Sequence, residues 1–463
     1  MTPSAPEPHW RKVESMDPVL LSRIQFGLSV GAHYIFPTIT LGLTLMILIF
    51  ETQYLRKGKE VFKETSMFLI RILAVVFVVG VATGLVLAVT IGTNWSSFSR
   101  LVGHVFGPAL AAEAIFAFFL ESVFLGVLLF WRNRVSKRIF WLSALFVTVG
   151  AYLSGLWILI ANSWMQTPAG YILASDGSIV VTDFAAAIFS PSLGIRYLHT
   201  IMGGIIGGTF LVAAVGVFYH LKGRHIEVSH TLVKYSMIVL FFSCLAMPLV
   251  GHLHSVQVAN TQPEKLAAYE GLWVTQANAP LSLFGIPDDA GGVTNFYVGA
   301  PGILSFLVHF DFNAPITGLN DFAPADRPPI FLSFVTYHTM VGIGVLLAGF
   351  VLLGAFLHWR KRFWATTWYL RLAPLVMPLA ILSNEIGWIA AEVGRQPWTV
   401  YHVLRTADAA SKVVPAWQIM TSLVLLAAVY GFLYLLFITR LRKILREGPK
   451  RADSPTVEGG AYE

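Results

Sequence analysis

Charged residues and cysteine are both scarce in this chain of 463 residues. Charged side chains make up 12% of it, about half the usual share of a soluble domain, and 56% of the residues are hydrophobic. The one cysteine, Cys244, lies in an apolar run, which excludes a disulfide framework and a cysteine-ligated zinc site. The composition therefore excludes an ordinary soluble protein and indicates a polytopic membrane protein.

Apolar windows long enough to cross a bilayer occur nine times. They predict an all-α polytopic membrane protein with nine transmembrane helices, near residues 20–54, 67–92, 109–131, 139–162, 197–220, 232–251, 329–357, 367–393 and 414–440. The segment 252–328 between the sixth and seventh helices is long enough to be either functional or disordered. Its aromatic and apolar content argues against disorder.

Lysine and arginine cluster in alternate connections and in the C-terminal tail, which accounts for the net charge of +7 without nucleic acid as a partner. The positive-inside rule then places the N-terminus outside and the C-terminus in the cytoplasm. The predicted organisation is an extracytoplasmic N-terminal extension (1–19), helices 1–6 (20–251), a long extracytoplasmic loop (252–328), helices 7–9 (329–440) and a cytoplasmic tail (441–463).

Several ionisable or soft side chains lie in or beside the predicted helices, where a charge costs about 2.5 to 3.5 kcal/mol on insertion scales. They are His33, Glu113, Glu121, His199, His338, Met340, Glu385, Glu392 and Arg395. Each has a purely structural alternative, in which a polar partner on a neighbouring helix satisfies it. With the topology above, the members from five different helices, His33, Glu113, His199, Met340 and Glu385, all fall in the outer half of the membrane.

Helical geometry limits what pairs of these residues can do. Glu113 and Glu121 are about 80° and about 12 Å apart on a helix, so they cannot share one ion but could be successive proton stations. His338 and Met340 are about 200° apart, so at most one faces a given site. Residue chemistry alone favours the histidine, because methionine is ordinarily core filler. Imidazole, thioether and carboxylate together suit haem iron better than zinc or magnesium.

At these residues the sequence resembles subunit I of the cytochrome bd-type quinol oxidases, from about residue 20 to 440. The resemblance is carried in order by "LSRIQF", "GVATGL", "GTNW", "AFFLES", "WILIANSWMQTP", "RYLHT", "KLAAYEGLW", "LFGIPD" and "EIGWIAAEVGRQPW". It implies a terminal respiratory oxidase in the bacterial inner membrane that oxidises quinol at the outer face and reduces O2 to water. Such an enzyme generates proton motive force without a pump.

The resemblance also implies cofactors and partners. The cofactors are a low-spin haem b, a high-spin haem b, and a haem d or a third haem b in its place. The partners are a second large membrane subunit (subunit II), small one-span accessory subunits, quinol, O2 and the lipid bilayer. The short loop resembles the short quinol-loop form. The motif "WMQTPAGY" resembles that of the branch described as cyanide-insensitive. The resemblance therefore leaves open whether haem d or a third haem b occupies the remaining high-spin position.

The resemblance assigns roles residue by residue. His199 and Met340 resemble the axial pair of the low-spin haem, which reverses the choice of His338, and His33 and Glu385 resemble the ligands of the two high-spin haems. Further roles fall on Lys265 and Glu270 (quinol binding, facing similar directions if helical), Glu113 and Glu121 (proton delivery), and Glu392 and Arg395 (haem propionates or their proton network). The alternatives are an ion-coupled transporter that uses the intramembrane carboxylates and a haem-b protein that only relays electrons.

Overall fold

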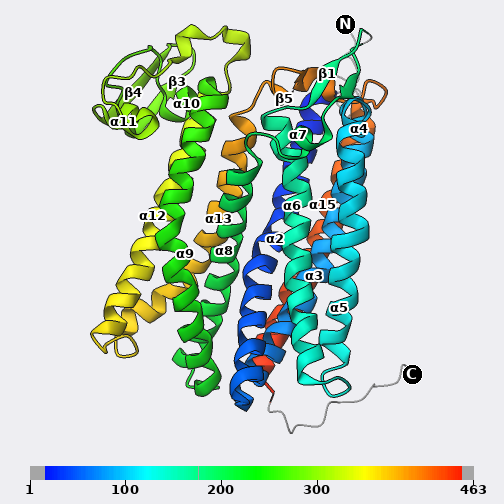
Figure 1. The fold of residues 1–463 in the computed structure, drawn as a ribbon, viewed down its shortest axis with the longest axis vertical. Helices are drawn as coiled ribbons and strands as arrows, with labels where there is room; N and C mark the ends of the chain where they lie inside the picture. Colours follow the sequence, from blue (N-terminus) through cyan, green and yellow to red (C-terminus); the bar gives the residue numbers. More distant parts are fainter. Residues whose placement is uncertain (1–15, 176, 451–463) are drawn as a thin grey trace, which may run out of the picture.

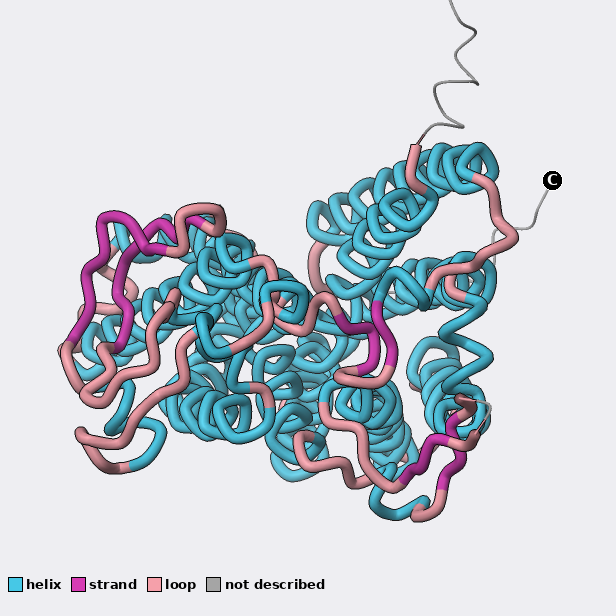
Figure 2. Tube along the Cα trace, turned by 90° about the horizontal axis from the view of Figure 1, so that it is seen from above, coloured by secondary structure: helices cyan, strands magenta, loops and turns pink. Residues whose placement is uncertain are grey.

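Long helices stand side by side in a bundle, and short β-hairpins lie across one of its ends (Figures 1 and 2). The computed structural model describes residues 16–175 and 177–450. The long helices are α2 (Pro18–Lys57), α3 (Glu60–Asn94), α6 (Lys137–Gln166), α8 (Leu193–Leu221), α9 (Ile226–Thr261), α12 (Ile330–Trp359), α13 (Thr367–Val393) and α15 (Ala416–Glu447). A further helical stretch consists of α4 (Ser96–Ala112), the π-helix η1 (Glu113–Phe118) and α5 (Phe119–Phe130).

Shorter elements connect the long helices. They are α7 (Phe184–Ile188), α10 (Pro263–Glu270), α11 (Ile303–His309), α14 (Thr406–Ala409), and two 3-10 turns, η2 (Leu319–Asp321) and η3 (Pro324–Asp326). Three antiparallel hairpins pair β1 (Tyr171–Leu173) with β2 (Ile179–Val181), β3 (Leu281–Asp288) with β4 (Val293–Ala300), and β5 (Trp398–Val400) with β6 (Leu404–Arg405). The fold is thus helical apart from small hairpins.

Eight helices within the described residues are long and apolar enough to cross a membrane. They coincide with eight of the nine predicted spans to within two residues at the ends that the helices do not reach. The remaining predicted span, 109–131, falls on α4, η1 and α5, where the π-helix Glu113–Phe118 interrupts the α-helix. The prediction of one continuous helix here missed the π-helix, because hydropathy reports the length and polarity of a segment but not a change in helix type.

The helix α2 lies at the centre of the bundle, packed against α3, α6 and α8. It starts after Asp17, whose side chain accepts a hydrogen bond from the Val19 amide. The backbones of α2 and α8 touch, because a Cβ atom at Gly42 would lie 2.7 Å from the Cα of Gly208. Small residues allow this close approach, which sets the spacing of the two helices that carry His33 and His199.

The segment 252–328 is ordered rather than structureless. Helix α9 continues to Thr261, beyond the predicted end near residue 251, and α10, the β3–β4 hairpin and α11 follow. Buried residues of α10 pack against Leu304 and Val308 of α11. A local apolar core therefore holds this segment over the end of the bundle.

The three hairpins and the start of α2 lie at one end of the bundle, here called the loop end, and α15 finishes at the opposite end (Figure 1). The predicted N-terminal extension falls mostly outside the described residues, as does the last part of the predicted tail. The helix α15 runs on to Glu447, so the first part of that tail is helical.

Candidate functional site

The predicted haem ligands His33 and Glu385 lie on contacting helices, α2 and α13. The Nδ1 atom of His33 is 3.0 Å from the Thr83 hydroxyl, and a Cβ atom at Gly84 would come within 3.1 Å of the His33 ring. A Cβ atom at Gly31 would lie 3.7 Å from Oε2 of Glu385. Glycines therefore make room beside both side chains.

The tautomer of His33 follows from its partner. The Thr83 hydroxyl already donates its hydrogen to the Val79 carbonyl oxygen at 2.9 Å. It can therefore only accept from His33, so Nδ1 of His33 carries the proton and Nε2 keeps its lone pair. This is the arrangement that a metal-binding histidine needs.

Met340 and His338 of α12 lie in different surroundings. The Met340 sulfur would be only 2.7 Å from a Cβ atom at Gly387, so it packs directly on α13 at that glycine. Both ring nitrogens of His338 lie 3.0 Å from backbone carbonyl oxygens, one of Phe334 and one of Ser282. Both ring nitrogens of His338 are thus placed to interact with backbone carbonyl oxygens, whereas the Met340 sulfur has no hydrogen bond to any of the described residues.

Glu392 lies in a polar cluster at the loop end of α13. It accepts hydrogen bonds from Asn162 at 3.0 Å and Gln166 at 3.4 Å, both on α6, and from the guanidinium group of Arg395. Arg196 of α8 donates to the side-chain oxygen of Asn162. Two guanidinium groups around one carboxylate leave an excess of positive charge, which suits the carboxylate groups of a ligand.

Lys265 of α10 joins this cluster from the other side. It is 1% exposed, and its ammonium group donates to Gln166 at 2.8 Å, to the Ala391 carbonyl at 2.9 Å and to Gln262 at 3.2 Å. Burial, and then the positive charge of Arg196, lowers the pKa of Lys265 well below its usual range. This residue is therefore not a solvated surface lysine.

Glu270, at the other end of α10, is also buried, with 2% exposure. It accepts a hydrogen bond from the Ser282 amide at 2.8 Å. Burial raises the pKa of Glu270 to about 7, against the opposing effect of the Ser282 hydrogen bonds. The prediction that Glu270 and Lys265 face similar directions is wrong, because five residues turn a helix by about 140° and the two side chains have different partners.

Glu113 is the first residue of the π-helix, and Glu121 lies in α5 just after it. The Ser154 hydroxyl on α6 donates to Glu113 at 2.9 Å, and Glu121 is 7% exposed. The charge of Glu113 acts on Glu121, so the two carboxylates are electrostatically linked. π-Helical turns occur frequently at functional sites, and this one changes the relative orientation that a plain α-helix would give.

The expected ligands are placed consistently for haem. His33, His199, Met340 and Glu385 each lie in the half of their helix nearest the loop end. Among the described residues, the buried atoms Nδ1 of His199, Oε1 of Glu385 and Nη1 of Arg395 have no hydrogen-bond partner. An unpaired carboxylate oxygen on Glu385 and an unpaired guanidinium nitrogen on Arg395 fit an iron ligand and a propionate partner, and the unpaired Nδ1 of His199 leaves Nε2 as the atom that would face iron.

Sequence reasoning missed several members of this site. Asn162, Gln166 and Arg196 lie inside quoted motifs, but only the structure shows that they surround Glu392. The ring of His254 on α9 lies 5.0 Å from the ring of His199. The histidine-rich string "GHLH" was the signal for His254.

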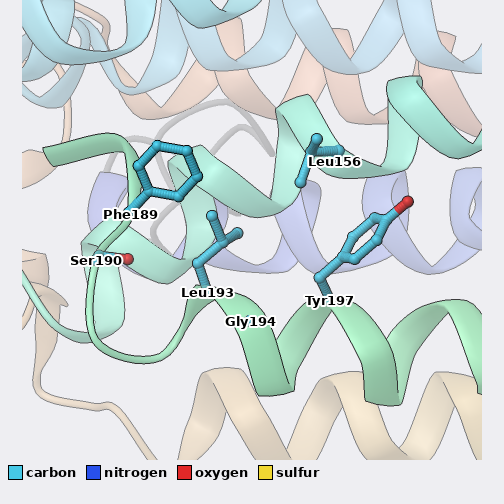
Figure 3. Close-up of a pocket in the computed structure, with 6 residues that line it drawn as sticks. All are labelled: Leu156, Phe189, Ser190, Leu193, Gly194 and Tyr197. Atoms are coloured by element: carbon cyan, nitrogen blue, oxygen red, sulfur yellow. The ribbon is translucent and has the colours of Figure 1, made fainter. Parts of the chain in front are cut away.

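A separate apolar cavity of about 250 Å3 lies among α6, α7 and α8 (Figure 3). It is lined by Leu156, Phe189, Ser190, Leu193, Gly194 and Tyr197. Tyr197 is two residues from His199, about 200° around α8. The cavity therefore opens on the other face of α8 and is not part of the polar site.

Comparison with known proteins gives the class of this helical bundle. The family model "Cytochrome bd terminal oxidase subunit I" matches residues 21–449. The chain is 34% identical to cytochrome bd ubiquinol oxidase subunit 1 of Bacillus subtilis, over 92% of this chain and 94% of that protein. It is 29% identical to cytochrome bd-II ubiquinol oxidase subunit 1 of Escherichia coli, over 96% of this chain and 100% of that protein.

A solved structure gives the same result. The structure of bd oxidase from Geobacillus thermodenitrificans matches with a TM-score of 0.86 and 32% sequence identity, covering 94% of this chain and 99% of that one. The chain belongs to the cytochrome bd terminal oxidase subunit I family. Membership implies an oxidoreductase of a bacterial membrane, with haem cofactors, that takes part in quinol oxidation and O2 reduction and pairs with a subunit II.

Proposed function

We propose that this chain oxidises a membrane quinol at an extracytoplasmic loop end and uses the electrons to reduce O2 to water. The observation that carries the proposal is that α10 buries both Lys265, which joins the polar cluster of Glu392 and Arg395, and Glu270, which contacts the hairpin residue Ser282. A buried lysine whose pKa is lowered and a carboxyl group whose pKa is raised to about 7 are suited to bind a quinol and take its proton.

The haem ligands in this proposal are those that the family resemblance implies. His199 and Met340 would hold the low-spin haem b, and His33 and Glu385 the two high-spin haems, a haem b and either a haem d or a third haem b. Arg395 would pair with a haem propionate. When bound, the haems supply one-electron transfer and the iron at which O2 reacts.

On the quinol side, the chain itself provides proton acceptance and positioning. Glu270 accepts a proton as quinol is oxidised, and the hairpin residue Ser282 holds its carboxylate in place. Lys265, fixed by Gln166 and the Ala391 carbonyl, presents its ammonium group between α6 and α13. Release of these protons at the loop end places them outside the cell.

The pH dependence of quinol oxidation tests the role of Glu270. Because its pKa is raised to about 7, the carboxyl group is protonated below that pH and cannot accept a quinol proton. The rate with quinol is expected to rise with pH, to reach half its maximum near pH 7 and to level off above it. Glu270→Gln should lower turnover about 100-fold and remove this dependence. Asp311→Asn, an exposed acid of the same loop, is the control. An unchanged pH profile in Glu270→Gln would contradict the assignment.

The protons that form water come from the opposite side of the membrane in this proposal. Glu113, held by Ser154, and the buried Glu121 form the last part of that route. Since quinol protons leave at the loop end, uptake from the cytoplasm separates charge across the membrane. Proton motive force then arises without a pump.

Glu121→Gln is expected to slow O2 reduction about 100-fold while haem content stays at the parent level. The substitution keeps the shape of the side chain and removes only its ability to carry a proton. Steady-state O2 consumption and the haem spectrum of the same preparation check this. Glu227→Gln, an exposed acid at the start of α9, is the control. Parent-level turnover in Glu121→Gln would remove the residue from the route.

The proposal includes the whole complex: subunit II, one-span accessory subunits, and ubiquinol or menaquinol as substrate. The two relatives described above are named as ubiquinol oxidases. Quinol-dependent O2 consumption by the purified complex tests the function. A haem-b electron relay would be reduced without consuming O2, and an ion-coupled transporter would do neither.

A further inference from the structure

His254 of α9 and His199 of α8 face one another at the loop end of the bundle. Their ring centroids are 5.0 Å apart and the rings are inclined at 65°. A Cβ atom at Gly251, one turn before His254, would lie 3.8 Å from Cε1 of His199, so α9 passes directly beside this ring. The two imidazoles are therefore neighbours with no side chain at Gly251 between the helices.

Each of the two rings has an unpaired nitrogen. Nδ1 of His199 and Nε2 of His254 are buried and have no hydrogen-bond partner among the described residues. Leaving a buried polar atom unpaired costs about 1 to 3 kcal/mol. A neutral imidazole has one donor and one acceptor nitrogen, so the two rings can satisfy each other after a small ring rotation.

His33, the other histidine expected to bind iron, has the hydrogen-bond partner at Nδ1 that His199 lacks among the described residues. His33 has a partner for Nδ1, the Thr83 hydroxyl at 3.0 Å, which leaves its Nε2 free. Metal-binding histidines almost always have such a partner, which orients the ring and increases its basicity. In the described part of the chain, Nδ1 of His199 has no hydrogen-bond partner, and the neighbouring ring of His254 has an unpaired nitrogen of its own.

We propose that His254 accepts a hydrogen bond from Nδ1 of His199 and thereby orients that ring and tunes the low-spin haem. This inference rests on the proposed function, because it takes His199 as an axial ligand. It makes His254 a positioning residue. Arg196 and Lys265 lie close enough to His254 for their charges to act on it.

The experiment measures the midpoint potential of the low-spin haem in the purified complex, by optical titration at fixed pH. The variants are His254→Leu and His254→Phe, which remove the acceptor, and His254→Gln, which can restore it. His252→Leu is the matched control, because it lies on the same helix and its ring packs against Phe310.

Without the hydrogen-bond acceptor on His254, the His199 ring donates less electron density to the iron. The oxidised iron is then less stabilised. The potential is therefore expected to rise in His254→Leu and His254→Phe, with the ratio of reduced to oxidised haem increased roughly tenfold at the parent's midpoint. That corresponds to about 59 mV for one electron. The low-spin bands should remain, and His254→Gln should lie close to the parent.

Two results would overturn the inference. A potential equal to that of His252→Leu, in whichever apolar variant assembles, would show that His254 does not act through His199. Loss of the low-spin bands in every His254 variant would instead make His254 an iron ligand. If the proposed function itself were wrong, the parent complex would contain no low-spin haem. Both results above require a low-spin haem in the parent, so the two failures can be told apart.

Discussion

Replacement of Met340 by alanine is expected to convert the low-spin haem to a high-spin form and to abolish quinol oxidase activity. The Met340 sulfur packs on α13 at Gly387, and its removal would leave the iron without its second protein ligand. Electrons from quinol then have no low-spin acceptor. The optical spectrum of the reduced complex and quinol-dependent O2 consumption measure the two parts of this expectation.

His338→Ala is the informative control, because this histidine lies two residues from Met340 on the same helix. Its ring nitrogens already contact the carbonyl oxygens of Phe334 and Ser282, so its loss should leave the low-spin spectrum intact. The opposite pattern, with low-spin bands kept in Met340→Ala and lost in His338→Ala, would show that the histidine is the ligand.

The second large effect is expected at Lys265. Lys265→Met removes a buried ammonium group that donates three hydrogen bonds, and its apolar side chain fills similar space. A hydrogen bond to a charged group is worth about 1.5 to 3 kcal/mol, so the KM for quinol should rise about 10- to 100-fold. Reduction of the haems by dithionite should be unaffected, because dithionite bypasses the quinol site.

Lys412→Met, an exposed lysine at the loop end, is the matched control and should behave as the parent. The comparison of quinol turnover with dithionite reduction decides the outcome. If Lys265→Met loses both to the same extent, the residue supports assembly of the protein rather than quinol binding.

The membrane helices were predictable because apolar length alone determines them. The π-helix at Glu113–Phe118 was not, since its hydrogen-bond pattern depends on packing against α6 rather than on hydropathy. The order in segment 252–328 was also missed in part. Its α10 helix is stabilised by contacts with α11 and α13 that are distant in sequence.

Residues with unusual chemistry in an apolar run, such as Glu392, could be singled out from the sequence as candidates. Residues that are recognised only through a partner on another helix could not be singled out in this way. Arg196 and His254 belong to this second group, because their positions beside Asn162 and His199 follow only from the packing of α6, α8 and α9. The different directions of Lys265 and Glu270 likewise depend on the docking of α10.

One optical spectrum of the purified complex tests the central claim most directly. The proposed ligand set predicts three haems, one of them low-spin. A chlorin band in the red would identify haem d at one high-spin position, and its absence with three b haems would identify the substituted form. A correctly assembled complex without haem would contradict the account.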